Sequence, residues 1–143
     1  MSVTVDKTVT INAPIADVLA IVRDVDRQSE WFPGNLVSEV TEKYDDGLVK
    51  RAHMVNDVKI AKDEFDLDYT HTDTTMSWSL VAPSKSQKDQ NGTWTLVDKG
   101  AATEATFSLT VDSSLPVPGF MQKKVIKGTA NDATDALKKR AEA

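Results

Sequence analysis

The stretch INAPIADVLAIV, from Ile11 to Val22, joins the end of a strand to the start of a helix. Asn12 carries a side-chain oxygen suited to a helix N-cap, and Pro14 has the fixed backbone angle that favours a first helical turn. Val18 and Val22 are four residues apart, so they lie on one apolar face of such a helix. We therefore predict a short amphipathic helix directly after a first strand.

The first strand itself is predicted from Val3 to Ile11. Apolar and polar residues alternate there with the period of two that gives a strand one buried face. A second short helix is predicted from Val25 to Trp31, because Pro33 and Gly34 then break the helical pattern. The chain thus begins with a strand and two short helices.

Most of the middle of the chain alternates in the same way. The turn-forming run Asp-Asp-Gly at 45–47 separates Leu36–Tyr44 from Leu48–Val55, which predicts a hairpin. The other segments with strand-like patterns include Thr74–Leu80, Thr93–Val97 and Ala105–Val111. Their connections are too short for parallel crossovers, so we expect about seven mostly antiparallel strands.

The C-terminal part of the chain, from about Pro118 to Arg140, is predicted to form a long amphipathic helix. One broad face of this helix should cover the open side of the sheet. The residues expected on that face are Phe120, Met121, Val125, Gly128, Thr129, Ala133 and Ala136. Glycine within a helix costs about 1 kcal/mol relative to alanine, which suggests that a strand or a ligand approaches Gly128 closely. A sheet held against one long helix tends to enclose a cavity.

The composition is that of a globular protein with one core. The chain has 143 residues, of which 40% are hydrophobic and 27% are charged. This length fits a single domain, residues 1–143. Its 22 acidic and 17 basic residues give a net charge of −5, which repels phosphate backbones, so no nucleic-acid partner is predicted.

Cysteine is absent, which excludes disulfides and thiolate metal sites. The amino terminus lacks the basic and apolar regions of a signal peptide, so a cytoplasmic location is predicted. No stable membrane insertion is expected. Motifs for triad hydrolysis, zinc proteolysis, Walker-type phosphate binding and dinucleotide binding are missing, and no cofactor is predicted.

Several stretches resemble one known group of proteins. The opening INAPIADVLAIVRDVD, the following EWFPGNLVSEV and the later GTWTL resemble the START-like superfamily, in particular its bacterial polyketide cyclase/dehydrase and coenzyme-Q-binding branch. The resemblance covers essentially the whole chain. It implies an α+β helix-grip fold, in which a curved antiparallel sheet holds a long C-terminal helix over a hydrophobic cavity. It transfers no catalytic residue, and Trp31, Pro33, Gly92 and Trp94 match as positions that set the shape.

Apolar and aromatic side chains on the predicted strands and the terminal helix are candidates for lining this cavity. Flexible methionine and flat aromatic side chains adapt to varied ligands. For any single residue, packing within the core is the better interpretation, whereas the implied fold favours cavity lining for the set. The set comprises Met54, Tyr69, Met76, Trp78, Phe107, Phe120, Met121 and Val125.

Three polar residues, Arg51, His53 and Asp132, are candidates for the same cavity. If Arg51 and His53 face inward, they place a cation and a titratable imidazole beside a ligand oxygen or an enolate. Two bases on an apolar face would need partners, so the solvent-facing alternative is favoured. Asp132 lies at the margin of the helix face, where exposure to solvent is again favoured.

A cluster of potential metal ligands, Asp66, Asp68, His71 and Asp73, falls within eight positions. Their spacing fits no defined metal-binding loop. Alternating acids on a strand are typical of its solvated face, so no metal site is predicted.

The favoured function is binding or transport of a small hydrophobic ligand, such as a lipid, a quinone or a polyketide-like molecule, in an internal cavity. The resemblance implies this range, and it also implies that some members catalyse aromatisation or cyclisation. The alternative is therefore a polyketide cyclase, aromatase or dehydratase in which groups such as His53, Tyr69 or Asp132 move protons. A third alternative is a protein-interaction module without a ligand. The oligomeric state stays open.

Overall fold

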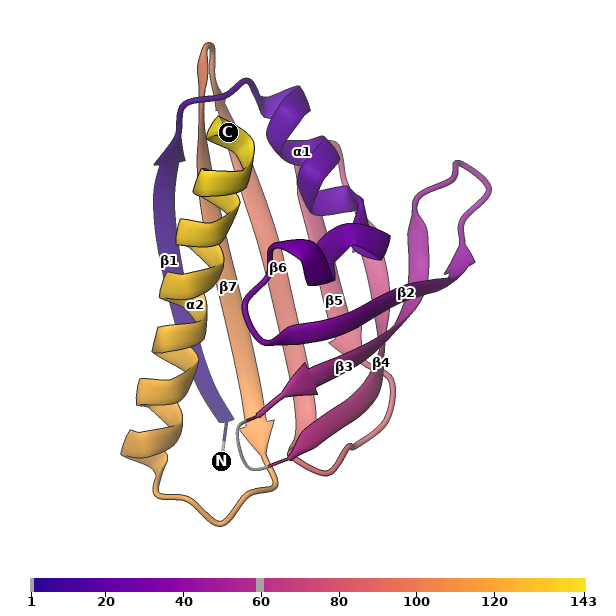
Figure 1. Ribbon diagram of the computed structural model, residues 1–143, viewed down its shortest axis with the longest axis vertical. Coiled ribbons are helices and arrows are strands. Elements are labelled where there is room, and N and C mark those ends of the chain that lie inside the picture. The colour runs from indigo at the N-terminus through magenta and orange to yellow at the C-terminus, as the bar shows by residue number, and fades with distance from the viewer. Residues whose placement is uncertain (1, 59–60) are drawn as a thin grey trace.

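One antiparallel sheet of seven strands carries all the helices on one of its faces (Figure 1). The computed structural model describes residues 2–58 and 61–143. In chain order the elements are β1 (Ser2–Ile11), α1 (Ile15–Arg23), the 3-10 helix η1 (Val25–Glu30), β2 (Asn35–Lys43), β3 (Val49–Asp57), β4 (Lys62–His71), β5 (Thr75–Leu80), β6 (Gln87–Lys99), β7 (Ala102–Ser113) and α2 (Gly119–Glu142). The predicted α+β class, strand number and pairing direction are confirmed.

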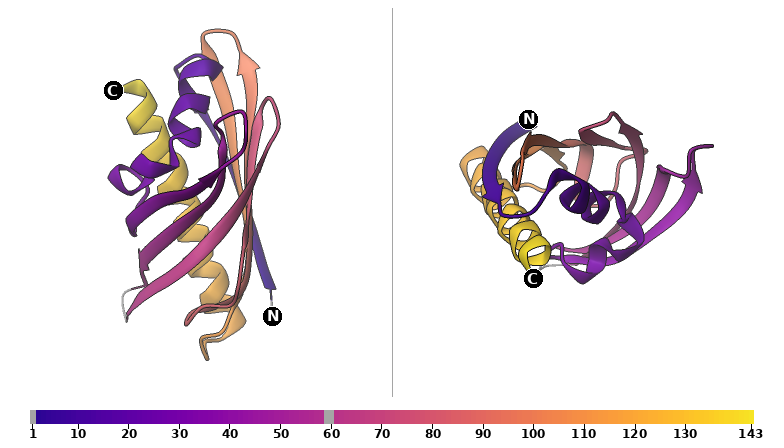
Figure 2. Two further views of the ribbon diagram at one scale, coloured as in Figure 1. Left: turned by 90° about the vertical axis from the view of Figure 1, so that its right-hand side faces the viewer. Right: turned by 90° about the horizontal axis from the view of Figure 1, so that it is seen from above.

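The sheet order is β1-β7-β6-β5-β4-β3-β2. Strands β2 to β7 therefore follow one another as neighbours, and β1 joins the far side by pairing with β7. Seen from above, the sheet curls into an arc that holds α1 and η1 in its opening, with α2 along β1 and β7 (Figure 2). This is the helix-grip arrangement, and it gives the sheet an inner face toward the helices and an outer face toward solvent.

The start of α1 differs from the prediction for Asn12. Pro14 precedes the first helical turn, and no side chain caps the helix. The carbonyl of Pro14 accepts hydrogen bonds from the backbone of Asp17 and Val18. Asn12 lies two residues too early to reach this turn, and its backbone N–H donates instead to Glu142 at 2.8 Å. The start of α1 is thereby joined to the end of α2.

α2 packs with a different face from the predicted one. Its buried residues are Ile126, Ala130, Ala133, Thr134 and Leu137, which form one stripe at helical spacing against β1 and β7. Of the predicted face only Ala133 is buried, whereas Phe120 is 76% exposed and Val125 is 67% exposed. Alanine lets the helix backbone come close to the strands, so the packed stripe contains small residues that a search for large apolar side chains passes over.

The surroundings of Gly128 also differ from the prediction. A β-carbon placed at Gly128 would meet no atom of the described residues within 4 Å. The side of the helix on which that β-carbon would point is therefore not in contact with a described strand. Among the helices of the described residues, none combines the length and the apolar character needed to cross a membrane.

Candidate functional site

Five of the eight predicted apolar candidates come together on the inner face of the sheet. Met54 lies on β3, Tyr69 on β4, Met76 and Trp78 on β5, and Phe107 on β7. Each is at most 9% exposed. The strand register explains the grouping, because side chains of the same parity on neighbouring strands face the same side. The other three candidates, Phe120, Met121 and Val125, lie exposed near the start of α2.

Aromatic rings form the centre of this inner face. The ring centroids of Trp94 and Phe107 are 4.7 Å apart, and those of Trp78 and Phe107 are 5.8 Å apart. The segment after η1 adds Trp31, 6.5 Å from Trp94, and Phe32, 6.0 Å from Phe107. Tilted ring pairs at these separations stabilise one another beyond simple burial. The result is an aromatic surface covered by the helical side of the molecule.

Gly92 positions the indole ring of Trp78. The two residues are paired across β5 and β6. The ring lies so close to the backbone of Gly92 that a β-carbon there would be 2.1 Å from it. Gly92 thus has the shape-setting role that the resemblance implies.

A chain of polar side chains runs from Trp78 to a buried acid. The indole Nε1–H of Trp78 donates to Gln90 Oε1 at 2.9 Å, and the amide of Gln90 donates to Gln87 Oε1. The amide of Gln87 in turn donates to Asp63 Oδ2 at 3.3 Å. This chain links the aromatic surface to the beginning of β4 and β6, at the end of the sheet where α2 starts (Figure 1).

Asp63 holds the loop between β5 and β6 against β4. Its carboxylate is 1% exposed and accepts hydrogen bonds from the hydroxyls of Ser84, at 2.7 Å, and Ser86. Burial alone would raise the pKa of Asp63, but the hydrogen bonds from Ser86, Ser84 and Gln87 together hold that pKa below its usual value. A charged carboxylate is therefore part of the folded state.

Tyr69 contributes a polar atom to the inner face. The residue is 2% exposed, and within the described part of the chain no group hydrogen-bonds to its hydroxyl. Burial raises the pKa of Tyr69 far above its usual value. The hydroxyl therefore stays protonated and can donate a hydrogen bond, but it cannot act as a base.

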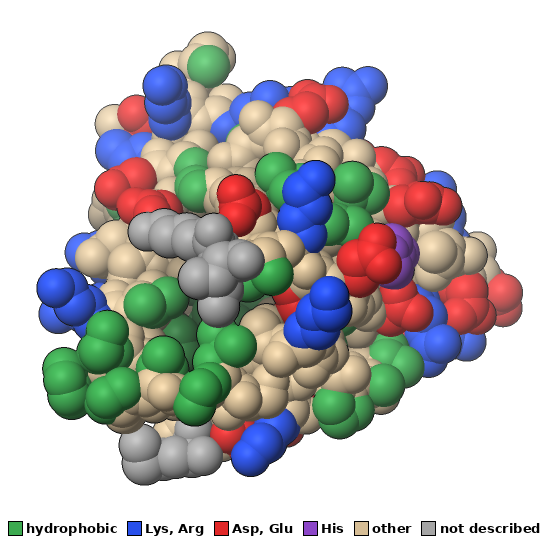
Figure 3. Space-filling model, turned by 60° about the horizontal axis from the view of Figure 1, so that its bottom comes forward, with side chains coloured by type: hydrophobic (Ala, Val, Ile, Leu, Met, Phe, Trp, Pro, Cys, Tyr) green, Lys and Arg blue, Asp and Glu red, His purple; other side chains and the backbone are tan. Residues whose placement is uncertain are grey.

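Hydrophobic side chains surround a hollow at the end of the molecule where α2 begins. Figure 3 shows this end, with hydrophobic atoms on the floor of the hollow and a group of them beside it. Basic side chains (Lys or Arg) stand around the same region. The hollow lies at the same end of the sheet as Asp63 and the polar chain.

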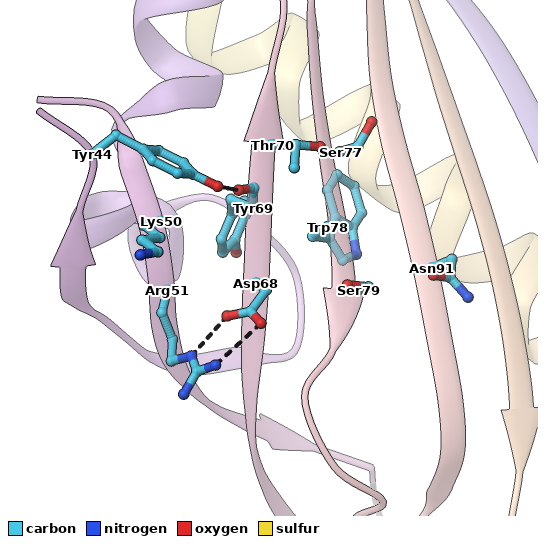
Figure 4. Close-up of a pocket in the computed structure, with 10 residues that line it drawn as sticks. All are labelled: Tyr44, Lys50, Arg51, Asp68, Tyr69, Thr70, Ser77, Trp78, Ser79 and Asn91. Atoms are coloured by element: carbon cyan, nitrogen blue, oxygen red, sulfur yellow. Dashed lines mark hydrogen bonds and ion pairs between the residues drawn. The ribbon is translucent and has the colours of Figure 1, made fainter. Parts of the chain in front are cut away.

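Arg51 and His53 lie on the outer face of the sheet, so the inward alternative for them is wrong. On β3 the side chains of Ala52 and Met54 are buried on the inner face, and those of Arg51 and His53 point to the other side. Arg51 donates to both carboxylate oxygens of Asp68, at 2.7 and 3.1 Å (Figure 4). His53 Nδ1 lies 2.7 Å from a carboxylate oxygen of Asp66. Both bases therefore lie on the solvent side of the sheet, where each pairs with an aspartate of β4.

Asp132, the third polar candidate, is exposed on α2, because the packed stripe of the helix lies on its other side. Of the four potential metal ligands, Asp66 and Asp68 pair with His53 and Arg51 as described. His71 lies near its strand partner β3, where its Nε2 is 2.8 Å from the carbonyl of Val49. Asp66 and Asp68 are thus engaged in pairs with β3, and Asp73 lies exposed in the turn after β4.

An open pocket of about 460 Å³ lies on the outer face (Figure 4). Its borders include Tyr44, Arg51, Asp68, Ser77 and Asn91, which are mostly charged or hydroxyl-bearing. The hydroxyl of Tyr44 reaches across to the backbone carbonyl of Tyr69 at 2.6 Å. Tyr69 and Trp78 also border the pocket, which is open to solvent and otherwise has polar borders, unlike the enclosed apolar sites that bind apolar molecules.

Sequence reasoning missed two kinds of residue at this site. Leu109, and Trp94, which the resemblance gave only as a shape-setting position, face inward with the same parity as the predicted candidates, so the alternation on β6 and β7 could have placed them in the site. Asp63, Gln87 and Gln90 gave no such signal, because polar residues on strands usually face solvent. Only the three-dimensional structure, with its strands side by side, shows that these three residues contact one another.

The curved sheet, the helices on its concave side and the apolar inner face define a helix-grip protein of the START-like class. The chain belongs to the family described as polyketide cyclase/dehydrase and lipid transport, whose model matches residues 2–142. No curated protein sequence is significantly similar to it.

Solved structures share this fold over nearly the whole chain. A START superfamily protein from Mycobacterium smegmatis superposes with a TM-score of 0.90 at 24% identity, covering 97% of each chain. The Zhui aromatase/cyclase from a Streptomyces species gives 0.86 at 15% identity, covering 99% of this chain and 94% of its own. A STAR-related lipid transfer protein from Xanthomonas axonopodis gives 0.74 at 17% identity, covering 98% and 86%. At these identities the likeness establishes the fold.

Proposed function

We propose that this protein binds a small hydrophobic molecule between the inner face of the sheet and the helices. The observation that carries the proposal is the aromatic surface formed by Trp78, Trp94 and Phe107, which faces the helical side from three neighbouring strands. Flat rings and the neighbouring methionines, Met54 and Met76, suit an apolar ligand whose affinity comes mainly from burial.

Tyr69 would orient the ligand within this site. Its buried, protonated hydroxyl has a hydrogen bond to give, and a carbonyl or hydroxyl oxygen of the ligand would accept it. A single donor on an apolar wall favours a ligand with one polar end. Lipids, quinones and polyketide-like molecules all fit this description, and the family description names both lipid transport and polyketide chemistry.

Catalysis is the second candidate function, because the family description includes cyclases and dehydrases. Three groups were candidates for moving protons: His53, Tyr69 and Asp132. Of these, only Tyr69 lies on the inner face, and burial keeps it protonated. The placement of His53 and Asp132 therefore favours binding over proton transfer. The cytoplasmic location and the lack of a nucleic-acid partner stay predictions.

Native mass spectrometry of freshly purified protein, compared with its denatured mass, tests the proposal. We expect a stoichiometric adduct of an apolar molecule retained from the host, released on denaturation. If the protein is instead recovered empty, titration with the neutral fluorescent probe N-phenyl-naphthylamine provides a second measurement. An empty protein that also fails to bind this probe saturably would contradict the proposal.

The adjacent residues Met54 and His53 offer a matched pair of variants for the probe titration. They lie next to each other on β3 but on opposite faces of the sheet. Met54→Ala should change the affinity for the probe, whereas His53→Ala should leave it unchanged. Equal effects of the two substitutions would place the probe elsewhere.

A further inference from the structure

The first turns of α2 carry an exposed group of large apolar side chains. Phe120 is 76% exposed, Val125 is 67%, Met121 is 47% and the preceding Val117 is 37%. We call these four residues the α2 patch. Single exposed apolar residues are normal on soluble proteins, but a contiguous set near the start of one helix marks an interaction surface.

The charge around the α2 patch is opposite in sign to that of the whole protein. Lys123, Lys124 and Lys127 are the only charged residues between Asp112 and Asp132, and all three are exposed. Within the described residues none of the three forms an ion pair. A chain with a net charge of −5 thus presents a locally basic helix whose charges are unneutralised.

The α2 patch lies at the end of the molecule that Figure 3 views. Hydrophobic side chains gather there over the start of α2 and continue to the rim of the hollow, with basic side chains beside them. Apolar and basic side chains together are the composition of helices that lie in a membrane interface. A bilayer containing acidic lipids offers both the apolar region and the negative charge that this surface complements.

We infer that the α2 patch docks the protein onto the surface of an anionic lipid bilayer. Phe120, Met121 and Val125 would enter the boundary between headgroups and acyl chains, and the three lysines would lie near the lipid phosphates. No membrane-spanning segment is involved. The inference extends the proposed function by placing the hollow against a source of apolar molecules, but it depends on the surface alone and not on a bound ligand.

A second copy of this chain is a weaker explanation of the α2 patch. A symmetric contact through the patch would bring together the same three lysines from each copy, and like charges at a shared surface oppose association. An anionic bilayer instead pairs each lysine with an opposite charge. The charge pattern therefore favours lipid over self-association.

Sedimentation with ligand-free protein and lipid vesicles tests the inference directly. We expect binding to vesicles of equimolar phosphatidylcholine and phosphatidylglycerol, little binding to phosphatidylcholine alone, and loss of binding in high salt, which screens charge. Lys123→Ser and Lys124→Ser should each weaken partitioning about fivefold. The double variant Phe120→Ser/Val125→Ser should weaken it at least as much. These side chains are exposed, so the variants should keep the melting temperature of the parent protein.

The matched control changes an exposed valine and lysine at the opposite end of the sheet. Val97→Ser/Lys99→Ser, in the hairpin between β6 and β7, should bind vesicles like the parent protein. The inference is overturned if the parent protein ignores anionic vesicles, or if control and patch variants bind equally. A dimer in lipid-free solution that the Phe120→Ser/Val125→Ser variant loses would also overturn it, in favour of self-association. Because the protein in this experiment is ligand-free, a failure to bind vesicles would count against the docking surface and not against the proposed binding of a hydrophobic ligand.

Discussion

The indole ring of Trp78 occupies the space that a side chain at position 92 would need. Gly92 on β6 lies opposite Trp78 on β5, and the ring is held there by its hydrogen bond to Gln90. The aromatic surface of the inner face therefore depends on the absence of a β-carbon at one position of a neighbouring strand.

Gly92→Ala should displace Trp78 and destabilise the protein by about 1–3 kcal/mol, the usual cost of overpacking a core. The new methyl group would overlap a rigid ring, which must rotate and lose its bond to Gln90. Chemical denaturation and the near-ultraviolet circular dichroism of tryptophan measure the two effects.

Gly128→Ala is the matched control for that substitution. It adds the same methyl group where no atom of the described residues lies within 4 Å. Because alanine favours helix, it should raise stability by up to about 1 kcal/mol. A loss of stability at position 128 would show that something approaches α2 there after all.

Asp63→Asn should lower the free energy of unfolding at neutral pH by about 1–3 kcal/mol, because it weakens charge-assisted hydrogen bonds to a buried carboxylate. The pKa of Asp63 is lower in the folded state than in the unfolded state, so its charge stabilises the fold above the unfolded-state pKa. This contribution is lost as pH falls from about 4 through the lower folded-state pKa. The difference between parent and variant should therefore shrink in acid.

Urea denaturation of both proteins across that pH range measures the effect. Asp132→Asn, at an exposed position of α2, provides the control and should change stability little at any pH. A constant difference between parent and Asp63→Asn down to the most acidic condition would show that the charge of Asp63 does not contribute.

Tyr69→Phe should weaken binding of an oxygen-bearing ligand about threefold to tenfold, the value of one hydrogen bond, without loss of stability. Calorimetric titration with a naphthoquinone and with naphthalene separates the effect of the hydrogen bond from that of apolar contact. Only the naphthoquinone should lose affinity. Tyr44→Phe is the control, because Tyr44 bonds to a backbone carbonyl from the outer face.

Arg51→Met should change stability little, because solvent screens an exposed ion pair, and it should leave probe affinity unchanged. Its ion pair with Asp68 lies on the outer face, where both side chains are more than a third exposed. Thermal unfolding at low and high salt and a probe titration measure the two expectations. A large loss of probe affinity would indicate a ligand on the polar outer pocket.

The order of strands and helices could be predicted because alternation and turn residues act locally. Thr74–Leu80 and Ala105–Val111 alternate cleanly, and both are strands in the structure. The prediction for the packed face of α2 was wrong because Phe120, Met121 and Val125 are larger and more hydrophobic than Ala130 and Ala133. Which side a helix buries depends on how near its backbone can come to a sheet, and that is decided by partners far away in the sequence.

Within the candidate site, too, residues marked by a local pattern could be predicted, whereas residues placed by distant partners could not. Met76 and Trp78 were identified because their strand has one unambiguous apolar parity. On β3 both parities mix polar and apolar residues, so only the acids of β4 opposite Arg51 and His53 establish the outer side. The polar chain from Trp78 to Asp63 joins residues of three strands, β5, β6 and β4, so no local sequence pattern predicts it.

The pairing of β1 with β7 also determines when this protein can fold. The first strand finds its partner only in the last, with Ser2 opposite Asp112 and Ile11 opposite Thr103. Contacts between such distant residues slow folding, because a long loop must close before they form. During synthesis β1 lacks its partner, and the aromatic face lacks Phe107, until β7 has left the ribosome. Unpaired strand edges on an incomplete chain are prone to aggregation, so the vulnerable interval of synthesis is the one that ends when β7 emerges.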